Sequence, residues 1–375
     1  MKTKQMRGVL VCIALIAVMG FSFSACEDSG DLNDLNNPNN PNNPNNPNNP
    51  NNPNNPNNPT IDGSWTVVEG IYFDGANTIA YGNGKFIAGG ENGLAYSPDG
   101  IVWSAVANST FGNNRIRATS YGNNKFIAGG NGGRMATSSD GIIWAAVGDS
   151  KFGASLNNIN AIAYGNDKFV AVGNSGKMAY SNDYGVTWTA VANSPFSSTP
   201  IQAVAYGNGK FVAGSDSGKM AYSSNGETWT AVTNSPFSNP ITVNEIAWGN
   251  GKFVAVGFGQ WQNGGKMAYS SNGETWTAVA ENKNPFYYPY TQGDEYNVFA
   301  DSAANIRAVA YGNGKFVAVS YGGKTAVSSD GSTWTVVAET VFGREYYDGT
   351  VSIAYGNDKF VAIAADGKFA YWADN

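Results

Sequence analysis

Short apolar runs alternate with turn-forming residues from about residue 60 to the end of the chain. In one stretch, Gly-Asn-Gly and Ser-Asn-Gly clusters separate the runs 201–206, 210–213, 219–223 and 228–232. Such short runs predict β-strands, and the glycines and asparagines between them tolerate the positive φ of tight hairpin turns. The pattern therefore predicts four-stranded antiparallel meanders.

This four-strand unit recurs along the chain. A motif of the form Ala-Tyr-Gly-Asn-Gly-Lys-Phe-Val-Ala repeats at intervals of 40 to 44 residues, with one interval of 63. Its aromatic residue is found at Tyr81, Tyr121, Tyr164, Tyr206, Trp248, Tyr311 and Tyr355. A period of this length with four strands per repeat and no helices is typical of β-propeller blades.

The two ends of the repeat region are complementary. A tryptophan follows the third strand in six units, at Trp103, Trp144, Trp188, Trp229, Trp276 and Trp334. The last unit stops at residues 371–375 without a fourth strand, while residues 63–68 precede the first unit and resemble an isolated fourth strand. We therefore expect an all-β fold, a seven-bladed β-propeller of four-stranded antiparallel blades, closed by an N-terminal strand that completes the last blade.

The turns between third and fourth strands resemble the Asp-box, or BNR, repeat, in which Ser or Thr, Asp, Gly, Thr and Trp stand at set spacings. Residues 181–188, Ser-Asn-Asp-Tyr-Gly-Val-Thr-Trp, match every defined position, and other turns are one residue shorter or carry Asn for Asp. Propellers of this kind include sialidases, lectin-like proteins, sorting receptors and assembly factors, so the resemblance implies a fold and no single activity. We expect the turn carboxylates to accept N–H groups of their own turns.

Sialidase activity is not expected. The resemblance would require six blades, three arginines that clamp a carboxylate and an Arg-Ile-Pro type motif near the start. Only five arginines follow the N-terminal segment, and residues 115–117 read Arg-Ile-Arg.

The first 25 residues predict an export signal. Three basic residues precede a continuous apolar run from Val9 to Phe21, which is short for a membrane span. The following Phe-Ser-Ala-Cys resembles the bacterial lipobox, which implies a lipid on Cys26 and cleavage before it. An ordinary cleaved secretory signal is the alternative. The predicted location is the cell envelope, outside the cytoplasm, at the outer membrane or cell surface.

Residues 26–59 are expected to form a tether between the lipidated cysteine and the propeller at 60–375. From Asn36 to Pro59 the sequence is Asn-Asn-Pro repeated, which offers no apolar surface to bury and loses amide donors at each proline. In polyproline II geometry this segment would reach at most about 75 Å. A selected spacer and an unselected repeat expansion both explain it.

Composition excludes several chemistries. Removing the signal takes away three basic residues and no acidic ones, so the formal charge goes from −6 to −9, which disfavours nucleic acid as a partner. The chain has no histidine, and its second cysteine, Cys12, lies in the signal, so we assign no catalytic residue, metal or cofactor. Carboxylate pairs suited to glycoside hydrolysis remain possible, although no spacing singles one out.

Two departures from the repeat are candidate ligand-binding segments. The loop 257–265 contains Trp261, and the connection 281–305 contains Phe286, Tyr287, Tyr288 and Tyr290. Both should lie on the face that carries the second-to-third strand loops, and exposed aromatic rings there would stack on a sugar or a peptide. The alternative is that the insertion folds onto the propeller and buries its own rings.

A second candidate lies on the innermost strands, four residues before each motif aromatic. This position holds Asn77, Arg117, Asn160, Gln202, Asn244, Arg307 and Val351. We expect these side chains to surround the mouth of the central channel, where Arg117 and Arg307 would favour an anionic group. Contact with channel water alone is the other possibility.

The leading functional hypothesis is a membrane-anchored extracytoplasmic lipoprotein whose propeller is a binding or scaffolding module for a glycan or a protein. A glycan-processing hydrolase with carboxylate catalysis is the main alternative. A structural subunit of an envelope assembly is the third. Two carboxyl groups converging in a pocket would favour the enzyme.

Overall fold

The computed structural model describes residues 64–70, 73–154, 156–238, 241–259, 264–287, 304–337, 342 and 349–373. The predicted domain boundaries after residues 25 and 59, and Cys26 with its tether, lie outside the described residues. No helix in the described ranges is long and apolar enough to cross a bilayer.

Each blade has four strands, ordered from the channel outward. The first, innermost strands are β2 Thr78–Gly82, β6 Ile116–Gly122, β10 Ile159–Gly165, β14 Ile201–Gly207, β18 Thr242–Gly249, β22 Ile306–Gly312 and β26 Thr350–Gly356. The second strands are β3 Lys85–Gly90, β7 Lys125–Gly130, β11 Lys168–Gly173, β15 Lys210–Ser215, β19 Lys252–Gly259, β23 Lys315–Ser320 and β27 Lys359–Ala364.

The outer strands are shorter. The third strands are β4 Gly93–Ser97, β8 Met135–Ser138, β12 Met178–Ser181, β16 Met220–Ser223, β20 Gly264–Ser270, β24 Thr325–Ser328 and β28 Phe369–Ala373. The fourth strands are β5 Ser104–Ala105, β9 Ala145–Ala146, β13 Thr189–Ala190, β17 Thr230–Ala231, β21 Thr277–Ala278, β25 Thr335–Val336 and β1 Trp65–Val68. In the described ranges three 3₁₀ helices accompany them, η1 Asn131–Gly133, η2 Asn174–Gly176 and η3 Glu281–Lys283.

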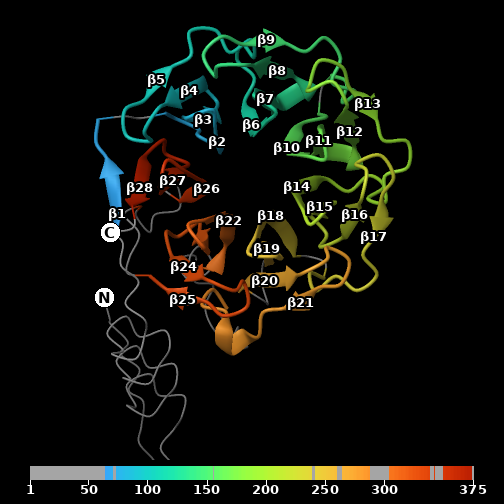
Figure 1. Ribbon diagram of the computed structural model, residues 1–375, viewed down its shortest axis with the longest axis vertical. Coiled ribbons are helices and arrows are strands. Elements are labelled where there is room, and N and C mark those ends of the chain that lie inside the picture. Colours follow the sequence, from blue (N-terminus) through green and yellow to red (C-terminus); the bar gives the residue numbers. More distant parts are fainter. Residues whose placement is uncertain are drawn as a thin grey trace, which may run out of the picture.

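Seven four-stranded antiparallel sheets form a ring around a central opening (Figure 1), which confirms the predicted seven-bladed propeller. We number the blades from the one that begins with β2, so that blade 7 begins with β26. Blade 7 has the order β1-β28-β27-β26, and Trp65 pairs with Trp372. The N-terminal strand therefore closes the ring as the sequence predicted, and Figure 1 shows β1 beside β28.

The motif Gly-Asn-Gly-Lys makes the hairpin between first and second strands. In blade 1, Asn83 and Gly84 have φ values of 46° and 70°, the left-handed conformation that a two-residue type I′ hairpin requires at both positions. The following phenylalanine enters the second strand, which is buried along nearly its whole length, as in β11 with Phe169 to Gly173. Turn chemistry and the apolar run thus set the same register in each blade.

The core lies between the blades. Seven clusters of buried residues correspond to the seven interfaces between neighbouring sheets. At each interface the last glycine of one innermost strand lies directly against the motif aromatic of the next blade, as Gly165 does against Tyr206. This series runs around the whole ring and returns from Gly356 to Tyr81, so ring closure depends on seven equivalent contacts.

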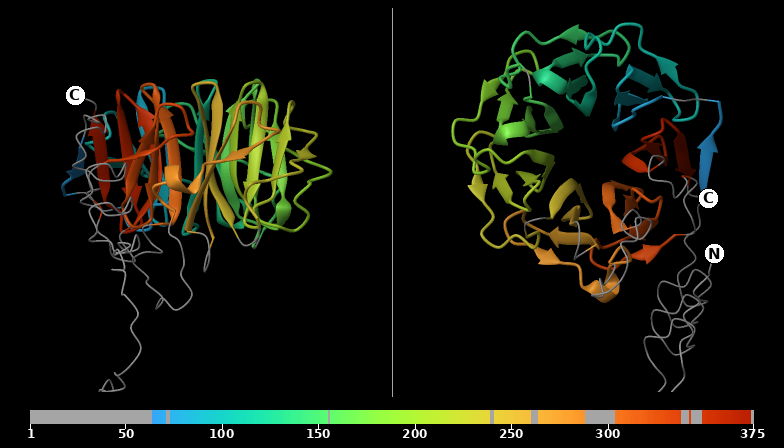
Figure 2. Two further views of the ribbon diagram at one scale, coloured as in Figure 1. Left: turned by 90° about the horizontal axis from the view of Figure 1, so that it is seen from below. Right: turned by 180° about the vertical axis from the view of Figure 1, so that it is seen from behind.

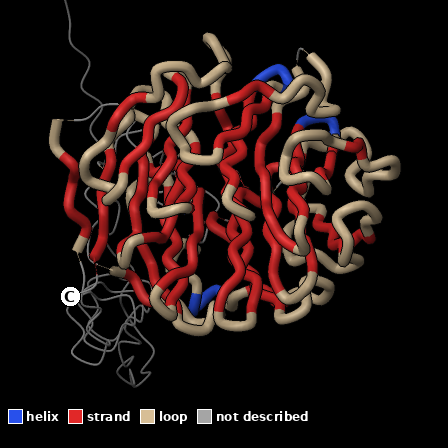
Figure 3. Tube along the Cα trace, turned by 45° about the horizontal axis from the view of Figure 1, so that its top comes forward, coloured by secondary structure: helices blue, strands red, loops and turns tan. Residues whose placement is uncertain are grey.

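The two faces of the disc carry different sets of loops and turns, which connect the strands at either end (Figures 2 and 3). We call the turn face the one that carries the first-to-second strand hairpins and the third-to-fourth strand turns. The cavity face carries the second-to-third strand loops and the connections between blades. Strands run from one face to the other, which Figure 2 shows in its edge-on view.

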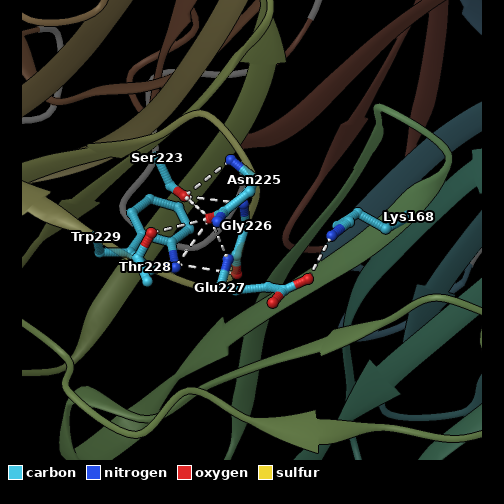
Figure 4. A network of polar contacts seen from close by, with 7 residues as sticks. All are labelled: Lys168, Ser223, Asn225, Gly226, Glu227, Thr228 and Trp229. Atoms are coloured by element: carbon cyan, nitrogen blue, oxygen red, sulfur yellow. Dashed lines mark hydrogen bonds and ion pairs between the residues drawn. The ribbon is translucent and has the colours of Figure 1, made fainter.

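Hydrogen bonds within each Ser-to-Trp turn of the turn face satisfy its polar groups. In the blade 4 turn, the Asn225 side-chain oxygen accepts the N–H groups of Glu227 and Thr228 at 2.9 Å each, and the Trp229 indole donates to Gly226 O (Figure 4). Asp140 makes the equivalent contacts in blade 2. These side chains therefore have the structural role expected from the sequence.

Candidate functional site

A cavity of about 1060 Å³ lies in the centre of the ring, at the end of the channel on the cavity face. Its wall consists of the first residues of the innermost strands and the residues that follow the second strands. All seven residues of the predicted inner ring line it: Asn77, Arg117, Asn160, Gln202, Asn244, Arg307 and Val351. The expected position of this ring is therefore confirmed.

A β-bulge presents the ring residue to the cavity in six of the seven blades. In β6 the pairing register with β7 shifts between Ile116 and Ala118, which leaves Arg117 as the extra residue. The same shift occurs around Asn160, Gln202, Asn244, Arg307 and Val351. The extra residue of a bulge is not paired in the ladder, so its side chain takes a different direction from those of its neighbours. The bulge therefore places a residue of the strand at the cavity.

In blades 2, 3 and 6 the residue just after the second strand contacts the ring side chain. Arg117 Nε donates to Asn131 Oδ1 at 2.6 Å, and Asn160 Nδ2 donates to Asn174 Oδ1 at 3.0 Å. In blade 6 the Arg307 guanidinium lies 5.3 Å from the centre of the Tyr321 ring. These contacts restrict the arginines to defined positions at the cavity wall.

Three ring asparagines tie neighbouring blades together. Asn77 donates to Arg117 O at 3.3 Å, Asn160 to Ile201 O at 3.0 Å and Asn244 to Ile306 O at 2.6 Å. Their amide donors are thus used inside the protein. Within the ring, the arginines are the side chains with charge to offer a ligand.

The cavity wall carries three guanidinium groups. Arg115 joins Arg117 and Arg307 there, and Arg115 pairs with Glu91 at 3.5 Å. Burial, followed by the charge of Arg115, lowers the pKa of Arg117. Arg115 Nε is buried and has no hydrogen-bond partner among the described residues. Partly buried cationic donors such as Arg115 and Arg117 suit an anionic ligand.

Two carboxyl groups line the same cavity, on the neighbouring blades 4 and 5. Asp216 accepts a hydrogen bond from Gln202, and burial raises its pKa despite that bond. Glu245 Oε2 accepts the N–H of Val309 on the next blade at 3.1 Å, and burial raises the pKa of Glu245 to about 8. No group of three or more His, Cys, Asp or Glu side chains able to hold a metal occurs in the described ranges.

Glu245 was not identified as a cavity residue from the sequence, although comparison of the repeats distinguishes it. The residue after the ring position is alanine in blades 2, 3, 4 and 6, threonine or serine in blades 1 and 7, and glutamate in blade 5. Thr78 uses this position in the same way, because its hydroxyl accepts the Thr119 N–H of blade 2 at 3.1 Å. Alignment of the seven repeats would have shown the exception.

Phe286 is not available for ligand stacking, contrary to the sequence prediction. It is 1% exposed and packs in the core between blades 5 and 6. Its N–H bonds to Asn284, and Lys324 Nζ both donates to Pro285 O and lies over the Phe286 ring. The described part of each connection supplies such a buried phenylalanine: Phe73, Phe111, Phe152, Phe196, Phe237, Phe286 and Phe342. The recurrence explains the burial, because the residue closes the core at the cavity face.

Tyr287 is partly buried and does not line the cavity. Burial and a hydrogen bond to Glu281 raise its pKa, so the phenol is held against η3. Trp261, Tyr288 and Tyr290 lie outside the described residues, and their proposed contribution stays a prediction. The structure thus brings together the arginine ring and does not join it to Phe286 or Tyr287.

No protein-family model matches the sequence, and no curated protein matches it at a significant level. Similar solved structures include YCF48 bound to D1 peptide, with a TM-score of 0.60, 17% identity and coverage of 83% of this chain and 96% of that one. YCF48 from Cyanidioschyzon merolae has a TM-score of 0.57 and 17% identity, with coverage of 83% and 99%. The GH74 xyloglucanase from Xanthomonas campestris has a TM-score of 0.60 and 14% identity, with coverage of 82% and 53%. Identities this low show a shared fold alone.

Proposed function

We propose that this protein is an extracytoplasmic binding module, held at a membrane by a lipid on Cys26, that takes a carboxylate-bearing segment of a protein or a glycan into its central cavity. The observation that carries the proposal is the cavity wall itself. Three arginines line it, Arg117 and Arg307 at bulges and Arg115 in a blade connection. The surrounding residues of the described chain form a polar ring.

Anion binding in the cavity is supported by the local charge of its wall and not by the net charge of the chain. The chain as a whole is acidic, with a formal charge of −6, so it does not attract anions in general. Cationic groups gathered in a recess nevertheless give a carboxylate paired, partly desolvated hydrogen bonds. One similar propeller was solved with a bound peptide, which fits a protein segment as the ligand.

A lipid anchor supplies the location. The apolar run, the Phe-Ser-Ala-Cys sequence and the tether at 26–59 all precede the closed ring. The seven blades need no residue before Trp65, because β1 is the first element of the sheets. Loss of labelled palmitate from the chain after Cys26→Ala, with export retained, is the result expected of lipidation at this residue.

Glycan hydrolysis is a second candidate, favoured by Asp216 and Glu245. Both carboxyl groups line the cavity, and the raised pKa of Glu245 suits a general acid that must stay protonated near neutral pH. One similar structure is a xyloglucanase, whose activity belongs to that protein. The Glu245 contact with the Val309 backbone gives the same residue a structural role between blades.

The test is binding of the mature chain, carrying Cys26→Ser, to an array of acidic and neutral glycans and to a library of peptides with free or amidated C-termini. Arg117→Gln and Arg307→Gln remove cavity charge, and Arg134→Gln is the matched control because Arg134 is exposed and does not line the cavity. Trp261→Ala tests the loop 257–265.

We expect carboxylate-dependent binding that falls at least tenfold in either cavity variant, since loss of a charged hydrogen bond costs about 1.5–3 kcal/mol, and that is unchanged in Arg134→Gln. Equal binding by all three arginine variants would refute the cavity as the site. Release of reducing sugar from any bound glycan, abolished by Glu245→Gln, would establish the hydrolase instead. An intact chain that binds neither library contradicts the proposal and leaves an envelope subunit as the remaining hypothesis.

A further inference from the structure

Exposed apolar side chains gather at one part of the turn face. Six large hydrophobic side chains of the described chain are exposed, and five of them lie in the Ser-to-Trp turns of the adjacent blades 1, 2 and 3. These five are Val102 (62%), Ile142 (39%), Ile143 (76%), Tyr184 (38%) and Val186 (66%). We call this set the apolar arc. The sixth, Leu156, lies in a blade connection on the opposite face.

The same turn positions are polar in the next three blades. Where Ile142 and Val186 follow the turn glycine in blades 2 and 3, Glu227 and Glu274 do so in blades 4 and 5, and a serine does so in blade 6. The turn geometry does not demand apolar residues, because the backbone contacts of the Asp or Asn side chain are the same in both groups. The arc is therefore a property added to three blades of a common scaffold.

Charge on the turn face changes in step with the arc. In blades 3 and 4 the hairpin lysine pairs with the glutamate of the following turn, Lys168 with Glu227 at 2.8 Å and Lys210 with Glu274 at 3.2 Å. In the described part of the chain no carboxylate forms an ion pair with the equivalent Lys85 or Lys125. The ammonium groups of Lys85 and Lys125, beside the arc, can therefore interact with a partner outside the chain.

The N-terminal strand meets the propeller at this same face. In blade 2, Phe126 of the second strand pairs with Ser138, the first residue of a Ser-to-Trp turn. In blade 7 the equivalent Phe360 pairs with Trp372, so Trp372 lies at the turn face. Trp65 pairs with Trp372, so the described chain begins at the turn face of blade 7, next to blade 1 of the arc. The segment that carries Cys26 is therefore joined to the disc on the side of the arc.

We infer that the apolar arc rests on a lipid bilayer, with Val102, Ile143 and Val186 inserted at the headgroup boundary and the cavity face directed away from the membrane. This inference rests on the lipid anchor proposed at Cys26. Aliphatic tips with neighbouring lysines are the composition of an interfacial contact, in which apolar burial supplies the attraction and ammonium groups meet lipid phosphates.

The acidic residues of the three turns do not oppose this contact. The carboxylates of Asp99 and Asp140 accept N–H groups of their own turns, and that of Asp183 accepts both the N–H and the hydroxyl of Thr187. Their charge is thus directed into the turn backbone. With two unpaired lysines beside three such carboxylates, we expect docking that depends more on apolar burial than on salt.

The first experiment places a reporter in the arc. The mature chain with Cys26→Ser contains no other cysteine, so Ile143→Cys introduces a single site for an environment-sensitive fluorophore. Thr275→Cys is the matched control, because Thr275 is exposed at the same turn position in blade 5. Vesicles of phosphatidylethanolamine and phosphatidylglycerol should shift the emission to shorter wavelength at Ile143→Cys and leave Thr275→Cys unchanged. Equal behaviour of the two sites would overturn the inference.

The second experiment removes the arc without disturbing the turns. Val102→Thr, Ile142→Glu, Ile143→Thr and Val186→Glu together copy the residues of the polar turns, so the variant should keep the melting temperature of the parent. Its partition onto the same vesicles should fall at least tenfold, roughly the effect of withdrawing one to two aliphatic side chains from an apolar environment. Unchanged partition in this variant would contradict the inference.

Two further outcomes separate this inference from the proposed function. Palmitate on Cys26 and ligand binding in the cavity, without any vesicle contact of the arc, would leave the binding module intact and disprove the docking. Concentration-dependent dimerisation that the arc variant abolishes, again without vesicle binding, would assign the arc to a second copy of this chain and equally disprove the docking. Vesicle contact of the arc in a chain that binds no ligand would support docking alone.

Discussion

At the scale of single residues, the strand position after the ring residue serves packing in most blades and carries an ionisable group in one. The residue that follows the ring position is small in six blades, where it fits between neighbouring innermost strands, and is Glu245 in blade 5. Glu245 still makes the blade-to-blade bond that Thr78 makes, yet it brings an ionisable group into the cavity wall. A single side chain thus couples the stability of the ring to pH.

Glu245→Gln should remove part of this pH dependence. The pKa of Glu245 rises from its usual 4.5 to about 8 on folding, so the folded chain holds a proton that the unfolded chain releases. The resulting stabilisation is complete below about pH 4.5 and is lost as the pH rises through about 8. Between about pH 5 and about pH 9, the melting temperature of the wild type should fall by several degrees more than that of the variant. Glu274→Gln, on the turn face, should follow the wild type, and identical curves for all three chains would refute the assignment.

Asp140→Ala tests the structural role of the turn carboxylates. Asp140 Oδ1 accepts the N–H groups of Ile142 and Ile143 at 2.8 and 2.9 Å, so its loss should cost about 1–2 kcal/mol in the free energy of unfolding. Asp140→Asn should cost little, because asparagine makes the same contacts at Asn225 and Asn272. Urea unfolding measures both. A large loss in the asparagine variant would indicate that the negative charge itself has a role.

At the scale of elements, each blade is a four-stranded antiparallel sheet, and the same sheet geometry recurs around the ring. Each innermost strand ends on a glycine because the motif aromatic of the next blade occupies the place of its side chain, as Tyr206 does beside Gly165. That aromatic ring also lies 4.7 Å from the phenylalanine of its own second strand, Phe211. The sequence Tyr-Gly-Asn-Gly-Lys-Phe therefore encodes both a turn and an interface.

Gly165→Ala should destabilise the propeller through this interface. A methyl group at Gly165 would overlap the Tyr206 ring, and overpacking in a close-packed core typically costs about 1–3 kcal/mol. Gly148→Ala is the control, because nothing lies within 4 Å of a methyl group placed there. Thermal unfolding of the two variants should differ by several degrees. Equal melting temperatures would mean that neighbouring blades can separate without cost.

At the scale of the whole molecule, closure and the difference between faces follow from the path of the chain. Because β1 pairs with β28, both ends of the propeller belong to one sheet and no blade lacks its fourth strand. The indole nitrogens of Trp65 and Trp372 have no hydrogen-bond partner among the described residues, unlike the Trp334 indole, which donates to Gly331. Blade 7 is therefore the one blade of the described ring in which chain ends replace the Ser-to-Trp turn.

Deleting residues 64–68 should weaken the whole ring. The deletion exposes the edge of β28 and the buried Trp372, and unpaired strand edges promote association between chains. We expect a lower melting temperature and concentration-dependent oligomers in sedimentation. Appending the same five residues after Asn375 through a short glycine-rich turn should restore a stable monomer, because the strand can then reach β28 from the other chain end. A deletion variant as stable as the parent would show that closure contributes nothing.

The turn motifs explain why the architecture could be predicted. Asn-Gly hairpins such as Asn83-Gly84, the recurring aromatics and the isolated strand before residue 70 are local signals, and a repeat multiplies each of them seven times. The inner ring could be predicted for the same reason, because equivalent residues of equivalent strands must meet around a channel. The burial of Phe286 does not follow from its own connection, because its signal is the recurrence of a buried phenylalanine in all seven connections.

Local sequence thus accounts for the blades, their number, the closing strand and the polar ring, since each depends on turn chemistry or on a side-chain period within a few residues. The cavity with its three arginines and two carboxyl groups depends on bringing together blades far apart in sequence, and the burial of Phe286 depends on packing between blades 5 and 6. Arg117 and Arg307 are separated by 190 positions along the chain, and only a closed ring places both around one cavity. The proposed ligand site therefore depends on the closed ring, because the side chains that line it come from all seven blades.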